Sequence, residues 1–160
     1  MFGITPDRKH AVAERWLALT IETYPPQARP FLLDEKDPFR NPVGQTLRDN
    51  IPALVDELFG EMDSKGLSQS LDPLVRLRAV QQFTPREAVG FVFLLKTALR
   101  QELTLPADTL RELESRVDLM ALAAFDFFVR CREQIHEIQA NEVMRRTSVR
   151  AKRCSGEAGR

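Results

Sequence analysis

The sequence predicts an all-α protein, a globular bundle of five to six helices with a long carboxy-terminal helix. Apolar residues recur at helical spacing through most of the chain, and typical helix-start residues precede several of these stretches. No segment alternates apolar and polar residues between hairpin turns, as β-strands would. A chain of 160 residues, 43% of them hydrophobic, is long enough to bury one sizeable core. We therefore expect a single helical domain.

The first predicted helix covers residues 6 to 22, because Thr5 offers a capping hydroxyl and Pro6 suits the first helical position. Residues 24 to 44 contain five prolines, so we expect an extended, stiff connection instead of a regular helix. Four apolar side chains of this connection are expected to reach the core: Phe31, Leu32, Leu33 and Phe39.

Two helices are predicted in the middle of the chain, each with a proline near its start. We place the first at residues 51 to 63, since Pro52 must begin a helix or kink one. The run Ser64-Lys65-Gly66 is typical of a helix end with glycine in the left-handed conformation. The second helix is predicted to start at Asp72-Pro73 and to end near residue 82.

The clearest helix start is Thr84-Pro85-Arg86-Glu87, a capping box with proline at the first helical position. The helix it opens, residues 85 to 102, is apolar on nearly all sides and is expected to be central in the fold. Glycine in a helix costs about 1 kcal/mol relative to alanine, so Gly90 predicts that another backbone passes close by. Three side chains of this helix are expected to be buried: Phe91, Leu94 and Leu95.

A heptad pattern predicts a last helix over residues 106 to 146. Its repeating positions are Leu110, Leu113, Val117, Met120, Ala124, Phe127, Cys131, Gln134, Ile138 and Asn141. Beyond residue 131 the apolar face narrows to a seam of Ile135, Ile138 and Val143. At ~1.5 Å per residue the helix would be about 60 Å long, so its end is expected to project from the globule.

Charge divides the chain into a helical domain, residues 1 to 146, and a basic flexible tail, residues 147 to 160. Residues 141 to 160 contain six basic and two acidic side chains, whereas the whole chain has a net charge of zero. A neutral chain disfavours a dedicated nucleic-acid binder. No apolar run reaches the ~20 residues of a membrane span, and no signal peptide is recognisable. With only two cysteines, we expect a cytoplasmic protein.

Two long segments carry a resemblance to a known family. The first reads DPFRNPVG from Asp37 to Gly44, and the second contains LDPLVRLRAVQ, FTP and GFVFLLK between Leu71 and Lys96. In this order they resemble the amino-terminal domain family of RsbRD-type RsbT co-antagonist proteins, over roughly residues 10 to 145. The resemblance implies a helical input domain of bacterial signalling proteins, usually joined to an output module such as a STAS domain or a histidine kinase. We expect a stand-alone member without an output domain.

The sequence predicts no catalytic residue, no cofactor-binding residue and no metal site. His10 and His136 lie on different predicted helices, and neither has further ligands at metal spacing. No phosphate-binding glycine loop or nucleophile-elbow motif occurs, which disfavours an enzyme. Cys131 lies on the apolar seam and is interpreted as a core residue, whereas Cys154 has basic neighbours and is the more oxidisable thiol.

Two pairs of polar residues have competing interpretations. Arg40 and Asn41, held between two prolines, either dock their loop or bind an anion, and docking is the favoured interpretation. Arg76 and Arg78 follow Asp72 on one helix, and a surface ion pair is the favoured interpretation for them.

These features favour a bacterial signalling input or regulatory domain that binds a protein partner and forms a homodimer through its last helix. We expect the partner-binding surface at Ile135, Ile138, Arg145 and Arg146. The alternative is a small-molecule or redox sensor with a ligand pocket in the helical core. No nucleic-acid partner, no cofactor and no stable membrane insertion are expected.

Overall fold

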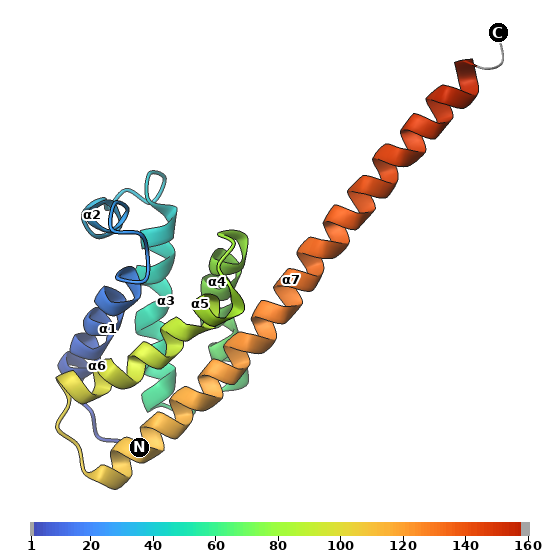
Figure 1. Ribbon diagram of the computed structural model, residues 1–160. Coiled ribbons are helices and arrows are strands. Elements are labelled where there is room, and N and C mark those ends of the chain that lie inside the picture. The colour runs from blue at the N-terminus through green and yellow to red at the C-terminus, as the bar shows by residue number, and fades with distance from the viewer. Residues whose placement is uncertain (1, 158–160) are drawn as a thin grey trace. The chain divides into compact units, whose positions relative to one another are not determined.

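The computed structural model describes residues 2–157, and they fold into helices and short connections without a strand. The elements are α1 (Pro6–Ile21), α2 (Arg29–Asp34), α3 (Pro42–Phe59), α4 (Ser64–Val80), α5 (Pro85–Gly90), the 3₁₀ turn η1 (Phe91–Phe93), α6 (Leu94–Glu102) and α7 (Ala107–Glu157) (Figure 1). Because α5, η1 and α6 follow one another without a break, we count this stretch as one helix with a 3₁₀ turn inside it. The described residues then contain six helices, and the predicted all-α class with its long last helix is confirmed.

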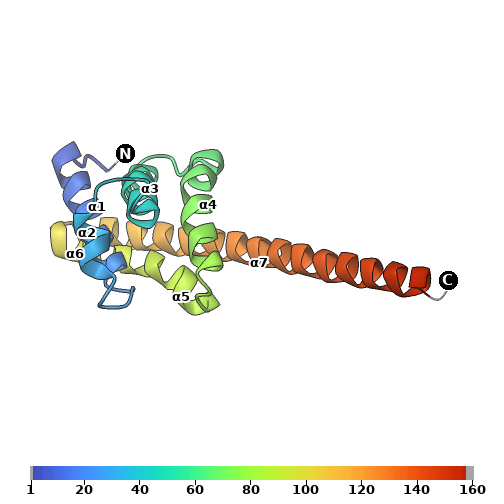
Figure 2. The same cartoon turned by 90° about the horizontal axis from the view of Figure 1, so that it is seen from above.

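The chain divides into two compact units, one up to Phe128 and one from Val129 onward. In the first unit α1 packs against α3 and α6, and α3 packs against α4 (Figure 2). The fully buried Trp16 of α1 stacks on Phe91, with ring centroids 5.9 Å apart and an interplanar angle of 9°. Its indole N–H donates a hydrogen bond of 2.8 Å to the Phe91 carbonyl, so the buried donor is satisfied and α1 is fixed to η1.

Polar contacts hold the first part of α7, up to Phe128, against the other helices of this unit. Lys96 of α6 pairs with Asp118 at 2.7 Å, and Arg100 pairs with Glu114 at the same distance. Arg116 donates to the carbonyls at the end of α3, which have no helical partner of their own. The heptad positions that are buried here are Leu113, Val117, Met120 and Ala124, as the pattern predicted.

The connection after α1 is more structured than its prolines predicted. Residues 29 to 34 form α2, because Pro30 occupies the first turn of this helix, where a backbone N–H is not required. The expectation that four apolar side chains reach the core was wrong for three of them. Leu32 is buried, whereas Phe31, Leu33 and Phe39 are 45%, 45% and 96% exposed.

Both middle helices begin earlier than predicted and continue through their prolines. Helix α3 starts at Pro42 and contains Pro52, and α4 starts at Ser64 and contains Pro73. An interior proline costs roughly 3 kcal/mol, but each large apolar side chain buried by these helices contributes ~1.5–3 kcal/mol, so packing outweighs the prolines. Ser64-Lys65-Gly66 begins a helix instead of ending one, since the carboxylate of Asp63 accepts from the Gly66 N–H.

The predicted helix from residue 85 to 102 is interrupted by the 3₁₀ turn η1. Its capping box is confirmed, with Glu87 N–H donating to Thr84 Oγ and Thr84 N–H donating to the Glu87 carboxylate. The Phe91 carbonyl accepts from both the Trp16 indole and the Leu94 N–H, which tightens the backbone into a 3₁₀ turn. No other backbone crowds the side-chain position of Gly90, because a Cβ built there would meet no atom within 4 Å beyond its own stretch of helix. That expectation was wrong.

Helix α7 continues to Glu157, past the expected end at residue 146. The described part of the proposed tail, residues 147–157, is therefore helical, and residues 158–160 of that tail lie outside the described residues. The flexibility of the tail stays a prediction.

Replacement of Leu95 by alanine is expected to lower the free energy of unfolding by about 2–5 kcal/mol, through lost transfer energy and the cavity left behind. Leu95 is fully buried, and Phe91 is also buried, whereas the neighbouring Leu94 is only half-buried. Urea denaturation measures the change. Leu33→Ala, at a 45% exposed position, is the control and should cost much less. Equal losses for both variants would contradict this packing.

Candidate functional site

Arg78 is the most unusual polar residue of the first unit, because it carries a charge and its side chain has no exposed surface. It follows Leu71, Leu74 and Val75 at helical spacing and therefore lies on the buried face of α4. Its interpretation as a surface ion pair was wrong. Arg76 lies on the exposed face, where it pairs with Asp72 at 3.2 Å as predicted.

Aromatic rings surround the guanidinium of Arg78. Its central carbon lies 4.4 Å from the ring centroid of Phe83, 5.0 Å from that of Phe91 and 5.3 Å from that of Tyr24. A cation so placed is attracted to the negative faces of the rings, by up to about 2 kcal/mol where water is excluded. This attraction offsets part of the cost of burying the charge.

Hydrogen bonds satisfy only one of the three guanidinium nitrogens. Nη2 donates to the Thr23 hydroxyl at 3.0 Å and to the Glu87 carbonyl at 3.1 Å. Nε and Nη1 are buried and have no partner. An unsatisfied buried donor costs about 1–3 kcal/mol, so the two unpaired nitrogens of Arg78 lower the free energy of unfolding. They can still donate hydrogen bonds to a further acceptor.

The end of α4 places Phe83 over the guanidinium. Phe83 N–H donates to the Arg78 carbonyl and Gln82 N–H donates to the Ala79 carbonyl, each at 3.4 Å. These are the two bonds of a Schellman motif, with Gln82 in the left-handed conformation at φ 61°. Because the motif brings the residue after the left-handed one against the last helical turn, Phe83 contacts Arg78.

Burial also changes the acidity of Tyr24. It raises the pKa of the phenol above the ordinary 10.0, and the positive charge of Arg78 opposes this effect only in part. The phenol donates to the Gln81 side chain at 3.2 Å. Burial likewise lowers the pKa of Arg78, although guanidinium remains charged at neutral pH.

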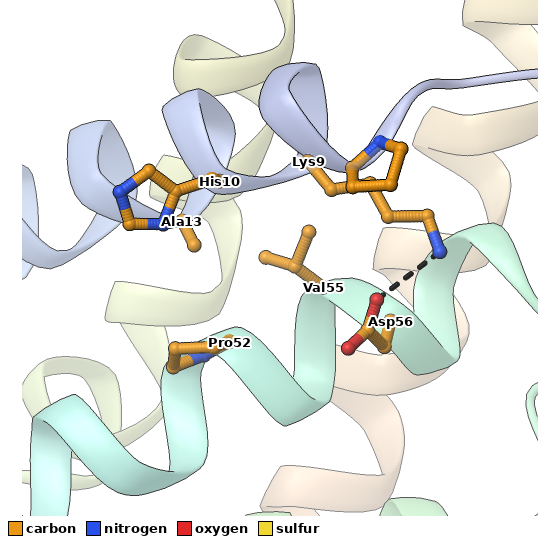
Figure 3. A pocket seen from close by; sticks show the side chains of 7 residues that line it. Lys9, His10, Ala13, Pro52, Val55 and Asp56 are labelled. Atoms are coloured by element: carbon orange, nitrogen blue, oxygen red, sulfur yellow. Dashed lines mark hydrogen bonds and ion pairs between the residues drawn. The ribbon is translucent and has the colours of Figure 1, made fainter.

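A hollow of about 250 Å³ lies between α1 and α3 (Figure 3). His10 and Pro52 line it, and Lys9 pairs across it with Asp56 at 3.1 Å. Since these two charges neutralise each other, this hollow offers no unpaired charge to a ligand.

The loop before α3 is held by Asn41, which is 1% exposed. Its side-chain oxygen accepts from the Gly44 N–H at 2.9 Å, and its amide nitrogen donates to backbone carbonyls of α2 and of Glu35. A Cβ at Gly44 would collide with the Asn41 side chain, which explains the glycine. Arg40 pairs with Glu35 at 2.9 Å. This geometry fits loop docking.

The residues expected to bind a partner lie in the second unit, on α7. Ile135 is half-buried and Ile138 is 65% exposed. Arg145 is exposed, and Arg146 pairs with Glu142 one turn earlier at 2.7 Å. Further exposed apolar residues on this segment are Val143, Met144 and Val149. Here the structure offers an apolar and basic helix surface.

Residues 2–157 offer little support for a metal site, for reactive thiols or for a membrane-spanning helix. They contain no group of three or more histidine, cysteine or acidic residues that could hold a metal ion. Cys131 is buried and Cys154 is exposed, and both are free thiols. No described helix is both long enough and apolar enough to cross a membrane.

The family model described as "RsbT co-antagonist protein rsbRD N-terminal domain" matches residues 10–143. The chain belongs to this family. No curated protein and no solved structure matches it. Both segments that carried the resemblance lie inside the match. One contains the Asn41 loop, and the other contains Arg78 and Phe83.

The single tyrosine makes the Arg78 cluster measurable. In a spectrophotometric titration the Tyr24 phenol is expected to ionise above pH 10.0 in the folded protein and at its ordinary pKa when unfolded. Since the folded pKa is the higher one, the stabilising contribution is complete below the unfolded pKa and is lost as the pH rises through the folded pKa. Arg78→Met removes the opposing charge and should raise the phenol pKa further. A folded-state pKa at or below 10.0 would contradict this environment.

Proposed function

We propose that the chain is a regulatory domain of bacterial stress signalling that acts by binding other proteins, and that it forms a homodimer through residues 129–157 of α7. Family membership supports the regulatory role, since the family is described as a domain of an RsbT co-antagonist protein. The observation that carries the binding surface is the exposure of apolar side chains on α7, with Ile138 65% exposed. We propose no catalytic step. The free thiols fit the reducing cytoplasm in which we place the protein.

The proposed interface is a narrow seam along α7. Ile135, Ile138, Glu142, Arg145 and Val149 follow one another at alternating steps of three and four residues, which is the spacing of coiled-coil contact positions. Two isoleucines and a valine supply the apolar contacts. The charges of Glu142 and Arg145, in the middle of the seam, determine whether two copies pair favourably in parallel or in antiparallel orientation.

Charge complementarity favours an antiparallel pair. A parallel pair would bring Glu142 against the partner's Glu142 and Arg145 against the partner's Arg145. An antiparallel pair brings Glu142 against the partner's Arg145 and Ile138 against the partner's Val149. It also places the acidic stretch from Glu133 to Glu142 beside the basic stretch from residue 145 to 153.

A sensor of small molecules is the second candidate function. The observation that favours it is the pair of unpartnered buried nitrogens on Arg78. A redox sensor has weaker support, which consists of the exposed thiol of Cys154.

Sedimentation equilibrium tests the dimer. The intact chain is expected to associate in a concentration-dependent way, and a chain that ends at Ala140 is expected to stay monomeric because the contact positions Glu142, Arg145 and Val149 are gone. Substitution of Ile135 and Ile138 by glutamine should also give a monomer. Higher salt should weaken the dimer, since exposed charge pairs are screened over about 8–10 Å.

Val143→Gln is the matched control, because Val143 is 63% exposed. The sequence pattern placed it on the apolar seam, but it does not occupy one of the coiled-coil contact positions proposed here. This substitution should leave the association constant nearly unchanged. A concentration-independent monomer for the intact chain would rule out the homodimer. An equal effect of Val143→Gln and the isoleucine substitutions would show that the seam is misplaced.

A further inference from the structure

A cavity of about 190 Å³ lies where α4 ends and α5 passes into η1. This volume is below the ~300–1,000 Å³ of pockets for drug-sized ligands, so it suits a small molecule. Its apolar wall consists of Phe83, Phe91 and Leu94, and its polar wall includes Thr23, Arg78 and Arg86. The cavity therefore combines an apolar interior with cationic groups.

Arg78 brings unused hydrogen-bond donors to this cavity. The side chain is fully buried and only Nη2 has partners, so Nε and Nη1 are left without an acceptor. A guanidinium is planar, permanently charged and well matched to oxyanions. The missing partner is therefore best supplied by a negatively charged oxygen.

Gly90 gives a second, independent indication. It lines the cavity, has ordinary helical backbone angles of φ −57° and ψ −26°, and would meet no atom within 4 Å if it carried a Cβ. Neither a special backbone conformation nor a close neighbour requires glycine at this position. The absence of a side chain keeps this wall of the cavity open.

Glu87 is the acidic residue of the cavity wall, and its carboxylate is engaged by Thr84. Its carboxylate accepts from the N–H and the hydroxyl of Thr84 at 2.9 Å each, as part of the capping box. These hydrogen bonds lower the pKa of Glu87 and hold the group at the helix start. Arg78 and Arg86 outweigh this single carboxylate, so an anion is favoured over a cation.

We propose that this cavity binds a small organic carboxylate with an aromatic or branched aliphatic body, whose carboxylate pairs with the unpartnered nitrogens of Arg78. The body packs against Phe83, Phe91 and Leu94. A carboxylate fits better than a phosphate, because a singly charged group costs less to remove from water than a doubly charged one. The guanidinium has no exposed surface, so the half-buried Phe83 ring must turn aside to admit the ligand.

The test is titration of the full chain with phenylacetate, benzoate, isobutyrate and acetate, each beside its neutral amide, and with inorganic phosphate. Calorimetry measures affinity, and the fluorescence of Trp16, the single tryptophan, reports the location because its ring stacks on Phe91. We expect phenylacetate or benzoate to bind and to change the fluorescence, and the amides to bind at least about tenfold more weakly. Binding only by phosphate, or by none of the carboxylates, would overturn the proposal.

Three variants locate the site. Arg78→Met should weaken carboxylate binding by about tenfold or more, because it removes the ion pair. Gly90→Leu should also prevent binding, because its side chain fills the cavity, and it keeps the test decisive if Arg78→Met fails to fold. Arg76→Met, at an exposed position of the same helix, is the control and should bind like the wild type. Unchanged affinity in Gly90→Leu would show that the ligand binds elsewhere.

Discussion

The contact between Trp16 and Phe91 is the constraint on which the arrangement of the first unit depends. The stacked rings and the indole hydrogen bond fix α1 against η1, at the point where the backbone changes from α5 to α6. The same Phe91 ring lies 5.0 Å from the Arg78 guanidinium, so the contact also forms one side of the aromatic enclosure. A single buried interaction thus joins the core of the domain to its most unusual polar residue. Stability and the candidate ligand site share these side chains.

Sequence reasoning succeeded where one local signal decides the structure. The residues of the Thr84 capping box specify a helix start by themselves, and the heptad positions from Leu113 to Ala124 were correctly expected to be buried. It failed at prolines, since the energy that carries α3 through Pro52 comes from tertiary burial and is not visible locally. The burial of Arg78 could have been predicted from the sequence, because Leu71, Leu74 and Val75 lie on the same face of the helix. The placement of Phe83 could not have been predicted. The residue before it adopts the left-handed conformation but is a glutamine, and this conformation is usually indicated in a sequence by glycine.

The two segments that carry the family resemblance have different roles in the structure. The stretch from Asp37 to Gly44 is explained by folding, because Asn41 caps α3 and holds the end of α2 through its amide. The stretch from Leu71 to Lys96 is only partly explained by folding, since it contains a buried cation with two unsatisfied nitrogens and a glycine with open space beside it. Features that lower stability and do not support the fold are typical of functional sites. In the function proposed above, the first unit would receive a chemical signal and the helix surface of the second unit would bind a protein.

The most direct measurement of the proposed protein contact asks which residues face each other across the dimer. In a background with Cys154→Ser, one protein carries Ile138→Cys and another carries Val149→Cys, and each is oxidised alone and after mixing. The antiparallel seam predicts a disulfide-linked dimer in the mixture and little or none in either protein alone. Cross-linking of Ile138→Cys with itself would show a parallel pair, and the absence of cross-links in all three samples would contradict the contact through α7.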